Sequence, residues 1–208
     1  LAPFEVKYQV YTGLAFERYA MSLQDKNQQI DLLKKSIEFY KKGVELNPFN
    51  AYYWGNLGRV YAFLGDLMNN PQYLAEAEKN YLKAIEKAPV TGLFYNNLID
   101  LYIRHNLIEQ ALPLFDKLES IDRNMAANAY FMLGNLFFTK KEFSNAEKFY
   151  IKTIELNNTL FQAYHNLGVV CAAQGKKNEA KTYLEKFLEM APDSDMVPNA
   201  KSILNGLK

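Results

Sequence analysis

Aromatic, leucine and small residues recur along the chain in one pattern that appears four times. In each copy an aromatic residue is followed three positions later by leucine, then by a small or apolar residue, and then usually by another aromatic residue. The copies are YYWGNLGRVYAFLGD, LFYNNLIDLYIRHN, NAYFMLGNLFFTKK and QAYHNLGVVCAAQG, and their leucines are Leu57, Leu98, Leu133 and Leu167. These leucines are 41, 35 and 34 residues apart. A period near 34 residues is typical of arrays of helix pairs, so the pattern predicts a helical repeat protein.

A second pattern follows each copy. It consists of a small residue, a large residue four positions on, a third residue three further, and a proline five further. It is found as Ala77-Tyr81-Ala84-Pro89, Ala180-Leu184-Phe187-Pro192 and, upstream, Ser36-Tyr40-Gly43-Pro48. Two further copies, Ala111-Phe115-Leu118 and Ala146-Tyr150-Thr153, have Arg123 and Asn158 in place of the proline. Together the two patterns resemble the tetratricopeptide-repeat (TPR) family from about residue 8 to residue 192. The resemblance implies an all-α fold, a right-handed α-solenoid of about five helix-turn-helix repeats with a degenerate first repeat and a C-terminal capping helix.

The alignment predicts a single TPR domain over residues 1–208. Its repeats are 8–48 (degenerate, with its first helix around Tyr11, Leu14 and Ala15), 51–91, 92–126, 127–160 and 161–192, followed by a capping helix in 193–208. The 41-residue step predicts an inserted loop at 66–72, which is either a tolerated bulge or a binding element. Gly65 and Gly175 are expected to end first helices in the left-handed conformation. Pro89 and Pro192 are expected to end second helices.

Composition and charge narrow the classes of function. The chain has 208 residues, of which 49% are hydrophobic and 23% charged, which indicates an ordered protein. A net charge of +1 argues against non-specific binding of nucleic acid. The one cysteine, Cys171, excludes an intramolecular disulfide and selects no compartment. No apolar run approaches the roughly 20 residues of a membrane span, so no membrane insertion is expected in this segment. The chain starts at Leu1 without a signal peptide, and cytoplasm and periplasm both stay open.

The sequence shows no grouping of residues that is typical of a catalytic site or a metal site. The sequence has no glycine-rich phosphate loop. His105 and His165 are about two repeats apart and have no carboxylate spacing that suggests a metal site. Cys171 falls at a core position, where a buried and inert thiol is expected. We therefore predict a protein that is not an enzyme and that has no cofactor and no metal site.

In the TPR family the first helix of each repeat lines a concave face, and a partner protein or peptide is expected there. The resemblance assigns to this face Tyr52, Asn56, Arg59, Phe63, Asn97, Asp100, Arg104, Phe131, Met132, Asn135, Phe138, His165 and Asn166. The degenerate first repeat would add Phe16 and Tyr19. Asn56, Asn97 and Asn166 share one repeat position, which is similar to the asparagine ladder of O-linked N-acetylglucosamine transferase, broken here by Met132. Such a ladder would hold a peptide backbone through both amide groups. Phe131, Met132 and Phe138 would offer pockets for apolar side chains.

Three hypotheses for function follow. The first is a scaffold for protein–protein interaction that binds a segment of a partner on the concave face. The second comes from the run ELNPFNAYYWGNLGRVYAFLGD together with the long first repeat and the inserted loop, which resemble the soluble TPR tails of bacterial O-antigen-ligase-like membrane proteins. That resemblance implies a regulatory or assembly tail of a membrane protein in cell-surface polysaccharide synthesis. The third is self-association through exposed apolar helix faces.

Overall fold

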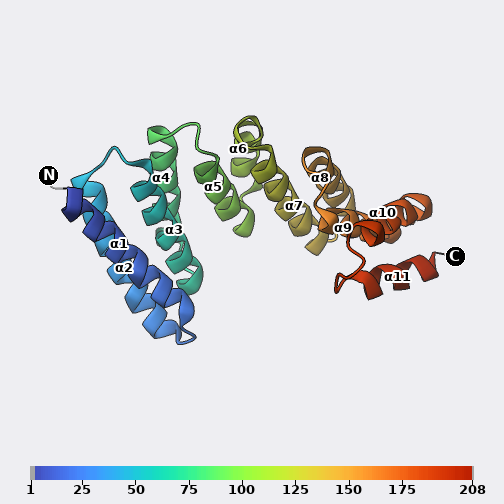
Figure 1. The fold of residues 1–208 in the computed structure, drawn as a ribbon, viewed down its shortest axis with the longest axis horizontal. Coiled ribbons are helices and arrows are strands. Elements are labelled where there is room, and N and C mark those ends of the chain that lie inside the picture. The colour runs from blue at the N-terminus through green and yellow to red at the C-terminus, as the bar shows by residue number, and fades with distance from the viewer. Residues whose placement is uncertain (1–2, 208) are drawn as a thin grey trace. The chain divides into compact units, whose positions relative to one another are not determined.

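The computed structural model describes residues 3–207, and these residues form eleven α-helices and no β-strand (Figure 1). The helices are α1 (Pro3–Ser22), α2 (Lys26–Leu46), α3 (Ala51–Met68), α4 (Pro71–Lys87), α5 (Gly92–Arg104), α6 (Ile108–Ile121), α7 (Arg123–Thr139), α8 (Phe143–Leu156), α9 (Phe161–Ala173), α10 (Lys177–Met190) and α11 (Val197–Gly206). They form two compact units, of which the first ends at Leu101 and the second starts at Tyr102, inside α5. The single domain and its repeat boundaries stay a prediction.

In the first unit α1 packs on α2, α2 on α3, and α3 on α4. We call the leading helix of each pair the A helix and the following one the B helix. A glycine of the A helix faces a tyrosine of the B helix in both pairs. A Cβ added to Gly13 would lie 3.1 Å from Tyr40 Cδ1, and one added to Gly58 would lie 2.8 Å from Tyr81 Cδ1. Both tyrosines are buried, so the missing side chain of glycine lets the two helices approach closely.

The second unit repeats this arrangement. The helix α7 packs on α8, α8 on α9, and α9 on α10, while α6 packs on α7. A Cβ on Gly134 would lie 2.7 Å from Tyr150 Cδ1, and one on Gly168 would lie 2.6 Å from Leu184 Cγ. At the C-terminal end α11 covers the last pair, because Ala200 packs with Leu184 and Phe187 in one buried cluster. The helix α11 lies within residues 193–208, where the sequence predicted a capping helix.

Some of the helices end where the sequence predicted, and one does not. Pro89 and Pro192 each follow a B helix by two residues, and Gly175 has a φ of 75° directly after α9 and its C-cap, as expected. Gly65, however, lies inside α3, buried against Leu74. The left-handed residue after this A helix is Asn69, whose φ is 49°.

The structure also corrects the loop expected at residues 66–72. The helix α3 continues to Met68 and α4 begins at Pro71, so the additional residues mainly lengthen the two helices. Asn69 and Asn70 make the turn: Asn69 closes α3, and the side chain of Asn70 accepts a hydrogen bond from Gln72 N at the start of α4. A tight connection between α3 and α4 needs only these three features: an asparagine in the left-handed region, an asparagine at the N-cap and a proline at the first helical position.

The first repeat is displaced from its expected register. Because Gly13 faces Tyr40 as Gly58 faces Tyr81, Gly13 occupies the small-residue position that the sequence alignment gave to Ala15. Phe16 consequently stacks on Phe39 of α2, with 5.5 Å between ring centroids, and does not line the A-helix face. Tyr19 is exposed.

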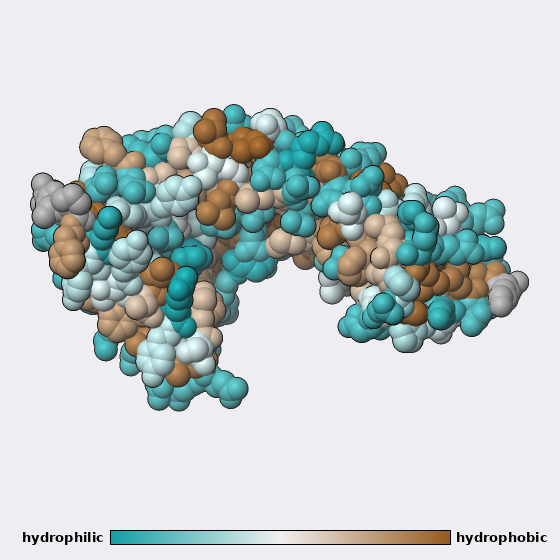
Figure 2. Space-filling view, in the orientation of Figure 1, coloured by the Kyte–Doolittle hydropathy of each residue, from teal (hydrophilic) through white to brown (hydrophobic). Residues whose placement is uncertain are grey.

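Figure 2 shows hydrophilic residues over most of the surface in view, with smaller hydrophobic areas between them.

Candidate functional site

The predicted partner-binding residues lie on A helices and on α5, and most are accessible to solvent in part. In the first unit Tyr52 is exposed, and Asn56, Arg59, Phe63, Asn97 and Asp100 are half-buried. In the second unit Arg104 and Phe138 are exposed, Phe131, Met132, Asn135 and Asn166 are half-buried, and His165 is buried. The two sets are described separately below, and "A-helix face" denotes these residues within either unit.

A charged network crosses the A-helix face of the first unit. Arg59 Nη2 donates to Glu17 Oε2 at 2.9 Å and to Asn56 Oδ1 at 3.3 Å. The hydroxyl of Tyr40 donates to the same Glu17 oxygen at 3.0 Å. The Glu17 side chain is only 2% exposed, whereas that of Arg59 is 43% exposed. The network therefore joins a buried carboxylate of α1 to a guanidinium of α3 that a partner can reach.

Burial dominates the electrostatics of this network. It raises the pKa of Glu17 above its ordinary value, although the neighbouring Arg59 charge and the hydrogen bonds from Tyr40 and Arg59 lower it. Burial also raises the pKa of Tyr40, and the carboxylate of Glu17 adds to that rise. Sequence reasoning missed Glu17 because the register of the first repeat was two residues off. The correct alignment of Gly13 with Gly58 would have placed Glu17 on this face.

A network of amide, hydroxyl and imidazole groups lies on the A-helix face of the second unit. The hydroxyl of Tyr150 donates to Asn135 Oδ1 at 2.7 Å, and Asn166 Nδ2 donates to the same oxygen at 3.0 Å. Asn166 Oδ1 lies 3.0 Å from His165 Nδ1. Burial raises the pKa of Tyr150 to about 12, so its hydroxyl stays protonated at neutral pH and acts as a hydrogen-bond donor. Three elements, α7, α8 and α9, thus contribute to one chain of hydrogen bonds.

His165 is less accessible than the sequence predicted. It is 7% exposed, because the capping helix α11 lies against it: His165 Nε2 is 2.9 Å from Asn199 Oδ1. Its ring also meets Phe187 edge to face at a centroid distance of 5.1 Å. A partner therefore reaches Asn166 more readily than His165. Asn199 was missed because α11 was assigned only as a cap.

The asparagines of the expected ladder are partly engaged by the protein itself. Asn56 accepts from Arg59, and Asn166 uses both groups of its amide in contacts with Asn135 and His165. Holding a peptide backbone would require Asn166 to exchange these contacts. The hydrogen-bonding groups are present, but they are arranged as networks inside each unit.

The apolar residues of the second unit lie beside its amide network. Phe131 packs partly on the core that contains Tyr150, with 5.8 Å between the two ring centroids. Phe138 is 37% exposed and lies 6.0 Å from Phe143. Half-exposed aromatic rings next to amide groups provide apolar contact and hydrogen bonding together, as protein-binding surfaces do.

Cys171 is buried, and burial raises the pKa of its thiol to about 11, so it is held as a core thiol. Within residues 3–207, no three histidine, cysteine, aspartate or glutamate side chains gather in a way that could hold a metal ion. The helices in this range are also too short or too polar to span a bilayer.

Comparison with known proteins agrees with the repeat geometry. Residues 39–69, 127–160 and 161–194 match models of the tetratricopeptide repeat. The chain contains TPR repeats. The human protein O-mannosyl-transferase TMTC3 is 29% identical over 189 residues, which cover 84% of this chain and 20% of that protein. The TPR repeat-containing protein MJ1428 of Methanocaldococcus jannaschii is 20% identical over 176 residues, which cover 83% of this chain and 31% of that protein. This TPR chain therefore spans about a fifth to a third of the length of these relatives.

Solved structures confirm the fold. MamA matches with a TM-score of 0.61 and 23% identity, covering 81% of this chain and 94% of MamA. YrrB, described as a TPR protein with an unusual peptide-binding site, matches with a TM-score of 0.56 and 21% identity, covering 90% of each chain. The predicted all-α TPR solenoid is thus confirmed. The protein is a TPR scaffold of a kind suited to protein–protein interaction.

Proposed function

We propose that the protein binds an extended segment of a partner protein on the A-helix face of its TPR repeats. The observation that carries the proposal is in the second unit, where Asn135 lies on the same helix, α7, as half-buried Phe131 and Met132, and its amide is linked to that of Asn166 on α9. Amides can exchange hydrogen bonds with a peptide backbone, and the apolar residues can accept its side chains. The peptide-binding site named for YrrB supports this use of the fold.

The first unit would add a charged contact. Arg59 uses one terminal nitrogen for both Glu17 and Asn56, and its side chain remains 43% exposed. A guanidinium presents five N–H donors, so donors remain for a carboxylate or a carbonyl of the partner. Glu17 neutralises part of this charge and fixes the position of the guanidinium.

The proposal can be tested by affinity capture from a lysate with variants chosen from the structure. Met132→Glu with Phe138→Glu places two charges on the A-helix face without removing Asn135, on which the buried Tyr150 depends. Leu82→Glu is the matched control, because Leu82 is 47% exposed on the B helix α4. All three proteins should show the same helical content and similar melting temperatures.

We expect the control and the wild type to capture the same protein and the double variant to lose it. Equal capture by all three would refute binding on the A-helix face of the second unit. The hypothesis of a tail on a membrane protein of polysaccharide synthesis stays a prediction, which the complete gene would test by showing or lacking membrane spans next to this segment.

Self-association also stays a prediction, and α1 is where we would look for it. Phe4, Tyr8 and Tyr11 are exposed along this helix, and tyrosine is enriched in protein interfaces. Light scattering over a dilution series, with Tyr11→Ser for comparison, would detect such contacts. A monomer at every concentration would exclude them.

A further inference from the structure

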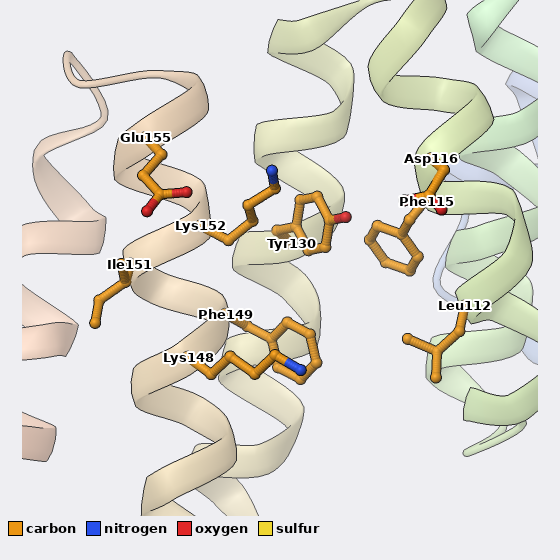
Figure 3. Close-up of a pocket in the computed structure, with 9 residues that line it drawn as sticks. All are labelled: Leu112, Phe115, Asp116, Tyr130, Lys148, Phe149, Ile151, Lys152 and Glu155. Atoms are coloured by element: carbon orange, nitrogen blue, oxygen red, sulfur yellow. The ribbon is translucent and has the colours of Figure 1, made fainter.

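A cavity of about 440 Å³ lies in the second unit between the B helices α6 and α8 (Figure 3), and its lining includes no residue of the A-helix face. We call it the B-helix groove. Its lining comes from α6, the first half of α7, and α8, and consists of Leu112, Phe115, Asp116, Tyr130, Lys148, Phe149, Ile151, Lys152 and Glu155. Its position separates it from the proposed peptide surface, so it requires an explanation of its own.

The floor of the B-helix groove is aromatic and preformed. The ring of Tyr130 lies between Phe115, at a centroid distance of 4.5 Å, and Phe149, at 6.2 Å. Phe149 is itself stacked on Phe137, with 5.4 Å between the two ring centroids, and this contact supports its orientation. All three floor rings are buried, yet they line an open cavity. Apolar pockets of this kind bury a ligand side chain at little conformational cost.

The two lysines on the rim of the B-helix groove, Lys148 and Lys152, differ in whether a carboxylate pairs with them. Lys152 Nζ forms an ion pair with Glu119 at 3.2 Å and lies 5.9 Å from the ring centroid of Tyr130, so its charge is already balanced. Lys148 Nζ lies 5.4 Å from the ring centroid of Phe149, and within the described residues no carboxylate pairs with it. Asp116 is on the opposite rim, on α6. Glu155 is on α8 as well, two turns beyond Lys148. The Lys148 end of α8 therefore favours an anion, and the α6 side disfavours one.

The corresponding groove of the first unit has aromatic residues of its own, Trp54, Tyr61 and Tyr73, but it differs at two positions of its B helix. Counted from the small residue of each B helix, Asn80 stands where Phe149 stands, and Lys79 stands where Lys148 stands. Lys79 pairs with Glu76 of its own helix at 3.3 Å. A phenylalanine and an unpaired lysine thus occur together on the B helix of the second unit and not at the equivalent positions of the first.

We propose that the B-helix groove is a second binding site, which takes a bulky apolar side chain adjacent to a carboxylate from a partner protein. The apolar side chain would lie on Tyr130 and Phe149, and the neighbouring carboxylate would pair with Lys148 on the α8 side. The hydroxyl of Tyr130 is protonated at neutral pH and contributes a hydrogen-bond donor. Burial and the carboxylates of Glu119 and Asp116 raise its pKa to about 12. The groove thereby specifies both a side chain and the side on which the negative charge must stand.

A selection from a library of random twelve-residue peptides displayed on phage tests this site directly. We expect wild-type protein to enrich peptides in which leucine or an aromatic residue adjoins aspartate or glutamate. A synthetic peptide of the enriched sequence should bind Lys148→Glu about tenfold more weakly in fluorescence anisotropy. Lys148 is on the exposed rim, so the variant should fold normally, and Lys79→Glu in the first unit is the matched control, expected to bind within twofold of wild type.

The variant of the A-helix face, Met132→Glu with Phe138→Glu, separates the two sites and should leave this peptide's affinity unchanged. Raising the salt concentration should weaken binding to wild type more than binding to Lys148→Met, because only the former retains the ion pair. The proposal is overturned if the selection yields no such pair of residues, if Lys148→Glu binds as well as wild type, or if the A-helix variant alone abolishes binding.

Discussion

The hydrogen bond between Tyr150 and Asn135 gives the sharpest test of the second unit, because it links a fully buried ring to the proposed peptide surface. Asn135→Ala removes the acceptor of the Tyr150 hydroxyl, which lies 2.7 Å away, and also the acceptor of Asn166 Nδ2 at 3.0 Å. An orphaned buried donor costs about 1–3 kcal/mol. Tyr150→Phe removes the donor and leaves Asn135 bonded to Asn166, so it should cost only about 0.5–1.5 kcal/mol.

The double variant should lose less stability than the sum of the two single changes, by about 1 kcal/mol, since the orphaned hydroxyl is then absent. Urea unfolding followed by circular dichroism measures all four proteins, and their slopes must agree before free energies are compared. Tyr150→Phe combined with Leu82→Ala, a pair in different units, should be additive and serves as the control. A coupling below about 0.3 kcal/mol between Asn135 and Tyr150 would refute the reasoning.

Further predictions concern the glycine contact and the charged network. Gly134→Ala should destabilise by about 1–2 kcal/mol in urea unfolding, since its Cβ would lie 2.7 Å from the buried Tyr150 ring and better helix propensity offsets only part of the overlap. Gly206→Ala, which meets nothing within 4 Å, should be neutral or slightly stabilising, and equal losses at both sites would contradict this account. Arg59→Ala should cost about 1–3 kcal/mol, less than a fully buried pair, because it leaves Glu17 buried with only the tyrosine hydroxyl; an unchanged melting temperature would count against it. The pKa of Glu17 is raised in the folded state, so the folded protein binds this proton more tightly than the unfolded chain does. The stability that Glu17 contributes therefore grows as the pH falls through the raised pKa, and it levels off below the ordinary pKa of a glutamate. The difference in unfolding free energy between wild type and Glu17→Gln should therefore depend on pH in this window, and a constant difference would exclude the shift.

The sequence was sufficient for the repeat unit because its contacts are local and recur. Each A helix must place a small residue against a large residue of its own B helix, so Gly58 with Tyr81 and Gly134 with Tyr150 are visible in the recurring sequence pattern. The helix ends at Pro89 and Gly175 were visible for a similar reason, since their backbone constraints act within a few residues.

What the sequence did not disclose depends on contacts between elements. Leu67 and Met68 are compatible with either a loop or a longer helix, and the packing of a lengthened α3 on α4 decides for the helix. The burial of His165 depends on where α11 docks, which no repeat spacing encodes. The aromatic floor at Tyr130 likewise combines three helices, and its residues appeared in the alignment only as ordinary core positions.

The glycine-to-large-residue contact also bears on how such a chain can change over generations. The large residues that contact Gly13, Gly58, Gly134 and Gly168 each lie in the same helix pair as the glycine. A duplicated or exchanged helix pair therefore retains this packing contact, which we call its closure. Substitutions on the outward residues, such as Lys148, then leave that closure untouched. A lineage can therefore acquire a new ligand by altering one pair while its neighbours keep folding as before. Within this protein, the difference between the grooves at Asn80 and Phe149 is the kind of divergence that such independence permits.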